Sequence, residues 1–160
     1  MRSPHLVLTR LIALVEVMGG SIGLWLLVDA SGRPFARSVG ELPFWLFSAL
    51  FIVTLAAGLG LWSGHRYGSP LSSLVQGLQV VWLSTPKFAF HFGAGAGLTI
   101  GVGRQGLCAE PFLGADFKLA TVSGFGVVLD RLPWSFGFNL VALACLLYLL
   151  LRAGRSAVPG

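Results

Sequence analysis

The chain has 160 residues, of which 55% are hydrophobic and 11% are charged, and its formal net charge is +5. Soluble domains contain roughly 25% charged residues. The composition therefore excludes an ordinary soluble domain and predicts one integral membrane domain over residues 1–160, with the lipid bilayer as its partner. The basic residues stand singly at the ends of apolar runs rather than in a stripe, which argues against a nucleic-acid-binding surface.

Four apolar runs predict four transmembrane helices, at residues 11–28, 44–63, 69–86 and 134–151. Each run holds about 18 to 20 residues, which at ~1.5 Å per residue nearly spans a ~30 Å hydrocarbon core. We expect the first run to be retained, because it is longer than the ~7 to 15 residues of a signal-peptide core. Tryptophans lie near the expected helix ends, where their rings favour the membrane interface: Trp25, Trp45, Trp62, Trp82 and Trp134.

A carboxyl group within the first expected span is the most distinctive polar feature. Glu16 is expensive in hydrocarbon, so we expect it to be protonated, paired or turned toward a polar bundle interior. Gln76 and Gln79 in the third span and Asn139 in the fourth are candidate hydrogen-bond partners. Glu16 is then a clamp that fixes helix register, part of a proton or ion relay, or a contact to a lipid headgroup or partner. Small residues share its side of the helix and favour close helix packing: Gly19, Gly20 and Gly23.

Residues 87–130, between the third and fourth expected spans, carry a period of two residues. Every even position from Phe88 to Val102 is apolar, whereas most odd positions are glycine. This alternation predicts a strand with two different faces. A second alternating run begins at Leu113, so we expect a β-hairpin-like insertion. Three consecutive residues are its candidate contact residues: Phe90, His91 and Phe92.

A helix is the alternative for the first of these runs. Gly93, Gly97 and Gly101 form a ladder of small residues four apart, which is typical of closely packed membrane helices. A helix would nevertheless carry many glycines, each costing ~1 kcal/mol relative to alanine, and it gives no reason for the alternation. We therefore favour the strand.

The positions of the basic residues predict the orientation. Arg66 and Arg152 lie at the ends of expected spans, on the side that holds both termini, whereas Arg104 and Lys118 lie deep in a long connection. Basic residues near span ends determine orientation, and long connections are translocated largely regardless of charge. We expect a multi-pass protein of the bacterial inner membrane, with both termini in the cytoplasm and the β insertion outside.

A set of positions spread over residues 58–150 carries a resemblance: Ser72, Gln76, Gln79, Ser84-Thr85-Pro86, Phe88, Phe90, Phe92, Ile100-Gly101 and Gly137-Phe138-Asn139-Leu140. In these residues the chain resembles small uncharacterised bacterial four-helix integral membrane proteins. The resemblance implies the four-helix architecture and no particular activity.

No motif assembles a reaction centre in this sequence. Gly101 to Gly106 fits G-x-G-x-x-G, but Leu107 to Pro111 cannot open the helix that a nucleotide-binding turn requires. The histidines His5, His65 and His91 have no metal-ligand spacing. We therefore expect no catalytic residue, no metal and no cofactor.

Three classes of function follow from these features. The first is a non-enzymatic scaffold, assembly or regulatory subunit that uses its β insertion to bind a membrane protein or a second copy of itself. The alternative is a small oligomeric channel or transporter in which Glu16 lines a polar path. A membrane enzyme acting on lipid is the least favoured class, because no acid, base and nucleophile are assembled.

Overall fold

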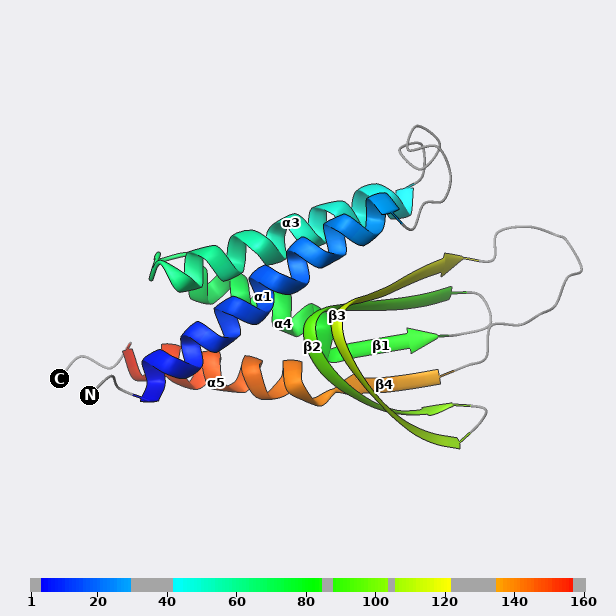
Figure 1. Cartoon of the computed structure of the whole chain (residues 1–160). Helices are drawn as coiled ribbons and strands as arrows, with labels where there is room; N and C mark the ends of the chain where they lie inside the picture. The colour runs from blue at the N-terminus through cyan, green and yellow to red at the C-terminus, as the bar shows by residue number, and fades with distance from the viewer. Residues whose placement is uncertain (1–3, 30–41, 85–87, 104–105, 122–134, 157–160) are drawn as a thin grey trace, which may run out of the picture.

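The computed structural model describes residues 4–29, 42–84, 88–103, 106–121 and 135–156. Its helices pack together on one side and its sheet lies at the opposite end (Figure 1). The helices are α1 (Pro4–Asp29), α3 (Leu42–Trp62), α4 (Gly68–Val80) and α5 (Leu140–Ser156). The strands are β1 (Val81–Ser84), β2 (Phe88–Gly103), β3 (Gly106–Thr121) and β4 (Ser135–Asn139).

The expected mainly α fold with four spans is wrong. Within the described residues, only His5–Asp29 in α1 and Phe44–Trp62 in α3 are long and apolar enough to cross a membrane. The third expected span, 69–86, is the 13-residue helix α4 followed at once by strand β1. The fourth, 134–151, contains strand β4 and most of α5. The architecture is a helical layer joined to an antiparallel sheet.

The error has a simple physical cause. A helix followed directly by a buried or lipid-facing strand is as continuously apolar as one spanning helix, so run length alone cannot separate them. At the end of α4 the β-branched pair Val80 and Val81 favours extended backbone. Val81 indeed has φ −110° and ψ 133°. Both α4–β1 and β4–α5 are therefore helix–strand units without a loop between them.

The strand expected between the third and fourth runs is confirmed. β2 and β3 pair antiparallel from Phe88 opposite Thr121 to Gly103 opposite Gly106. The partner strand begins earlier than the expected Leu113, and residues 122–130 of the expected insertion lie outside the described residues. The period of two, rather than the glycine ladder, was the informative signal.

The sheet curls until it closes on itself. β1 pairs with β4 along one edge and with the start of β2 along the other, while β4 pairs with the end of β2. Such curling requires a bend in the long hairpin. Gly95 and Gly114 lie opposite each other with φ of +103° and +114°, a backbone conformation that residues with a Cβ disfavour. Figure 1 shows both strands bending sharply beside α1.

The two faces of β2 have different neighbours. On the even face, Phe92 packs against Phe47 and Phe51 of α3, with a ring-centroid distance of 5.2 Å to Phe51. On the odd face, aromatic rings lie directly on glycines: Phe112 over Gly93 and Gly97, and Trp82 over Gly101 and Gly137. The glycine-rich face thus leaves the space that the aromatic rings of β1 and β3 fill.

Helix α1 runs along the bend of the hairpin. A Cβ on Gly19 would lie 2.0 Å from the backbone nitrogen of Gly95, and one on Gly20 would lie 2.9 Å from the backbone of α3. Gly23 lies against the ring of Phe51. The glycines near Glu16 therefore allow two close contacts. Gly19 lets the sheet approach α1, and Gly20 and Gly23 let α3 approach it.

Candidate functional site

Glu16 forms a buried polar cluster between α1 and α4. Its side chain is fully buried. The Ser72 hydroxyl donates a hydrogen bond of 2.5 Å to Glu16 Oε1, and Gln76 Nε2 donates one of 2.9 Å to the same oxygen. Ser72 and Gln76 are four residues apart and share one face of α4. One acceptor oxygen therefore fixes two donors of a neighbouring helix, which is the geometry expected of a register contact.

The second carboxyl oxygen of Glu16 is buried and has no hydrogen-bond partner among the described residues. One oxygen of the carboxyl group thus binds α4, whereas the other is buried without a hydrogen bond among the described residues. The cost of such a group is large unless it is neutral or its contacts compensate for the lost water.

The other two candidate partners of Glu16 bind elsewhere. Gln79 Oε1 accepts a hydrogen bond of 3.0 Å from the backbone N–H of Ala94 in β2. Gln79 is buried, and it ties the end of α4 to the sheet next to the hairpin bend. The amide nitrogen of Gln79 has no partner among the described residues.

Asn139 forms the N-terminal cap of α5. Its Oδ1 accepts hydrogen bonds from the backbone N–H groups of Val141 and Ala142, at 3.1 and 3.3 Å. These N–H groups belong to the first turn of the helix, where they have no acceptor within the helix itself. The same oxygen accepts a third bond, of 3.3 Å, from the N–H of Leu98 in β2. The role of Asn139 is therefore structural, at the junction of β4, β2 and α5.

Replacing Asn139 by alanine should lower the free energy of unfolding by about 2 kcal/mol, because the helix loses its cap and Leu98 loses its acceptor. The measurement is thermal and denaturant unfolding in detergent micelles. Asn139→Asp keeps the acceptor oxygen and places a negative charge at the helix N-terminus, so it should lose less than about 1 kcal/mol. An equal loss in both variants would contradict the capping role.

The hairpin candidates differ in their surroundings. Phe92 is fully buried in the core, and Phe90 packs partly buried against the same cluster. His91 is half-buried on the opposite face, between Trp82 at 5.9 Å and Phe112 at 6.4 Å between ring centroids. Phe90 and Phe92 therefore stabilise the contact between sheet and helices, whereas His91 belongs to the inner face of the curled sheet.

A small cavity of about 100 Å³ lies beside His91 on this inner face. The hydroxyl of Thr99 is buried on its wall and has no hydrogen-bond partner among the described residues. Trp82 and Phe112 supply aromatic walls, and the exposed Glu110 also lines the cavity. The inner face of the sheet is thus more polar than its outer face.

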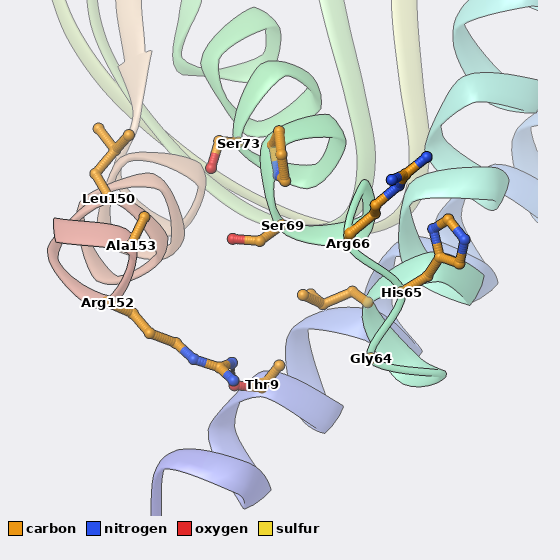
Figure 2. Close-up of a pocket in the computed structure, with 11 residues that line it drawn as sticks. Thr9, Gly64, His65, Arg66, Ser69, Ser73, Leu150, Arg152 and Ala153 are labelled. Atoms are coloured by element: carbon orange, nitrogen blue, oxygen red, sulfur yellow. Dashed lines mark hydrogen bonds between the residues drawn. The ribbon is translucent and has the colours of Figure 1, made fainter. Parts of the chain in front are cut away.

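A larger cavity, of about 570 Å³, lies at the other end of the molecule, between α1, the turn before α4, and α5 (Figure 2). Arg152 of α5 reaches across to α1, where its Nη1 donates a hydrogen bond of 2.6 Å to Thr9 Oγ1. Tyr148 of α5 joins the same contact, because its hydroxyl donates a hydrogen bond of 2.9 Å to the backbone oxygen of His5. Polar contacts therefore tie the start of α1 to the end of α5.

Sequence reasoning missed most of this second site. Polar side chains at spacings of four on α4, Ser69 with Ser73 and Ser72 with Gln76, were a visible signal for polar faces on that helix. Thr9 and Arg152 come from opposite ends of the chain, and no local pattern brings them together.

Comparison with protein families, with curated protein sequences and with solved structures finds no match to this chain. The resemblance to small bacterial membrane proteins thus stays a prediction, and the geometry alone must carry the functional argument.

Proposed function

We propose that the chain is a non-enzymatic protein of the bacterial inner membrane, held in the bilayer by α1 and α3, that acts by pairing the edge of its sheet with a second copy of itself. The cytoplasmic position of both termini is part of this proposal. The observation that carries it is the set of exposed apolar side chains on the helices and on the outward face of the sheet.

The helical part of this surface has the features of a membrane span. α1 has 26 residues, about 39 Å at ~1.5 Å per residue, which exceeds a ~30 Å hydrocarbon core. Trp25 and Trp45 are exposed near one end of the α1–α3 pair, and Trp62 is exposed at the other. There the Arg10 guanidinium lies 5.5 Å from the centre of the Trp62 ring. Tryptophans at both ends of an apolar surface, with a basic residue beside one of them, are typical of the two membrane interfaces.

The sheet continues the apolar surface. Its register places Val81 opposite Phe138, Leu83 opposite Phe136 and Val102 opposite Phe136, so these side chains share one face. All are exposed, as are two leucines of β3, Leu107 and Leu113, at 78% and 81%. Apolar side chains outside and polar ones inside are the arrangement of a lipid-facing sheet.

A lipid-facing strand cannot leave its backbone unpaired, because each unsatisfied N–H or C=O in hydrocarbon costs several kcal/mol. Among the described strands, β3 pairs only with β2. Its other edge therefore requires a strand from outside the described chain. A two-fold pairing of β3 with β3 satisfies both copies with one contact, which is the commonest form of oligomer.

The geometry shows which donors face this edge. The N–H of Leu98 points to Asn139 on β4, so Leu98 and its partner Pro111 do not hydrogen-bond to each other. Pro111 lacks an N–H, and its nitrogen faces the free edge, the position where a strand tolerates proline. Because the pattern alternates, the N–H groups of Leu107, Ala109 and Leu113 also face outward.

Ala109→Pro should therefore weaken self-association at least tenfold while leaving the β2–β3 ladder intact. The measurement is native mass spectrometry of protein extracted in detergent from carbonate-washed membranes, over a series of protein concentrations. We expect the wild-type protein in the washed membrane fraction and mainly as a dimer.

Ala109→Val is the matched control, because it keeps the N–H and should dimerise like the wild type. Loss of the wild-type protein from membranes on carbonate washing would contradict membrane residence. A monomeric wild type, or a complex with a different protein through β3, would contradict self-pairing.

The channel hypothesis gains no specific support from Glu16, which is fully buried between α1 and α4.

A further inference from the structure

The 570 Å³ cavity has the size of a ligand site, since such sites are commonly ~300 to 1,000 Å³. It lies where α1 begins and α5 ends, at the end of the helices away from the sheet (Figures 1 and 2). Its walls come from four separate elements of the chain: α1, the end of α3 with the following turn, α4 and α5.

The polar groups of this cavity converge from two sides. Ser69 and Ser73 of α4 point their hydroxyls into the space between α4 and α5 in Figure 2. Neither hydroxyl has a hydrogen-bond partner among the described residues. From the opposite side the Arg152 guanidinium crosses to Thr9, so a group between the two helices would meet a cation on one side and two hydroxyls on the other.

The charge around the cavity has one sign. Arg66 and Arg152 both line it, and no carboxylate occurs among the described residues of its wall. The Arg66 guanidinium lies at the edge, stacked 4.5 Å from the centre of the Tyr67 ring. The first turn of α4 adds partial positive charge, and Tyr67, at its N-cap, provides no side-chain acceptor. Together these groups favour an anion with several acceptor oxygens.

The apolar part of the wall indicates how that anion is carried. Leu61 and Leu150 line the cavity, and Leu147 and Leu151 on the same helix as Leu150 are exposed. The Arg10–Trp62 contact, which we assign to a membrane interface, lies at this same end of the helices. A ligand at this place is best matched by a polar head attached to an apolar tail.

We infer that the cavity binds the phosphate group of an anionic lipid headgroup, with Arg152, Ser69 and Ser73 as its ligands. This inference rests on the proposed membrane residence. Arg152 supplies the charge-assisted contact, the two serine hydroxyls donate to the remaining phosphate oxygens, and the leucines contact the glycerol and the first methylenes of the acyl chains.

The test is native mass spectrometry of the detergent-solubilised protein titrated with dioleoyl phosphatidylglycerol, with dioleoylglycerol as the lipid that lacks phosphate, and with soluble glycerol 3-phosphate. We expect phosphatidylglycerol to bind at least tenfold more tightly than either of the others. Equal binding of dioleoylglycerol would overturn the phosphate contact. Equal binding of glycerol 3-phosphate would overturn the lipid assignment in favour of a soluble phosphate.

Variants locate the site. Ser69→Ala combined with Ser73→Ala should weaken phosphatidylglycerol binding about fivefold to tenfold, and Arg152→Gln should weaken it more than tenfold, whereas Arg152→Lys should keep most of it. Arg10→Gln removes a charge at the same end but outside the cavity and should change binding less than twofold. Because Arg152 also ties α5 to Thr9, the serine variant is decisive if Arg152→Gln does not fold. Unchanged binding in the serine variant would overturn the site.

The same spectra give the oligomeric state, so failure of lipid binding in an intact membrane dimer is distinguished from failure of the proposed function.

Discussion

Gly19→Ala should prevent the helices and the sheet from docking, with a loss of at least about 3 kcal/mol in the free energy of unfolding, at the upper end of overpacking effects. The added methyl group would lie 2.0 Å from the backbone nitrogen of Gly95 and 2.6 Å from its Cα. Neither side can give way cheaply, because both are backbone and Gly95 is held at the hairpin bend. The measurement is the yield of folded protein and its unfolding midpoint in detergent.

The matched control is Gly77→Ala on α4, where an added Cβ meets nothing within 4 Å. That variant should be neutral or more stable by up to about 1 kcal/mol, because alanine favours the helix. A Gly19→Ala protein as stable as Gly77→Ala would show that α1 and the hairpin are not in backbone contact.

Glu16→Leu should cost about 2 to 5 kcal/mol, because it leaves the Ser72 hydroxyl and the Gln76 amide buried without their acceptor. Glu16→Gln keeps an oxygen at the position of Oε1, so both hydrogen bonds can persist and the loss should stay within about 1 kcal/mol. Unfolding by denaturant in micelles measures both variants.

A double-mutant cycle with Ser72→Ala isolates the contact. In the Ser72→Ala background the cost of Glu16→Leu should fall, because one of the two stranded donors is absent. Equal costs in both backgrounds, or a Glu16→Gln variant as unstable as Glu16→Leu, would contradict the register contact.

The strand β2 was predictable because its signal is local. Eight even positions from Phe88 to Val102 are apolar, and side chains alternate between the faces of a strand with the same period. The four spans were not predictable from run length, because α4 with β1, and β4 with α5, are apolar without interruption. Asn139 carried a usable signal, since asparagine directly before an apolar helical run is typical of an N-cap. That signal would have separated α5 from the strand before it.

The candidate site was predictable in part, for a related reason. A carboxyl group in an apolar helix requires polar neighbours, and Gln76 is one of the few polar side chains in the other apolar runs. Ser72 shares its face at a spacing of four, although hydroxyls are too frequent for serine alone to be a guide. The cavity that Arg152 and Ser69 line depends on how α1, α4 and α5 are arranged, which no spacing within one segment encodes.

The loop-free junctions of the fold couple its two ends. α4 passes directly into β1 and α5 is entered directly from β4, and β1 and β4 are themselves paired. At one end of the two helix–strand units the strands β1 and β4 are paired. At the other end their helices, α4 and α5, line the cavity of Figure 2. We expect a change in the separation of α4 and α5 at Ser69 and Arg152 to alter the angle between β1 and β4, because no loop lies between each helix and its strand.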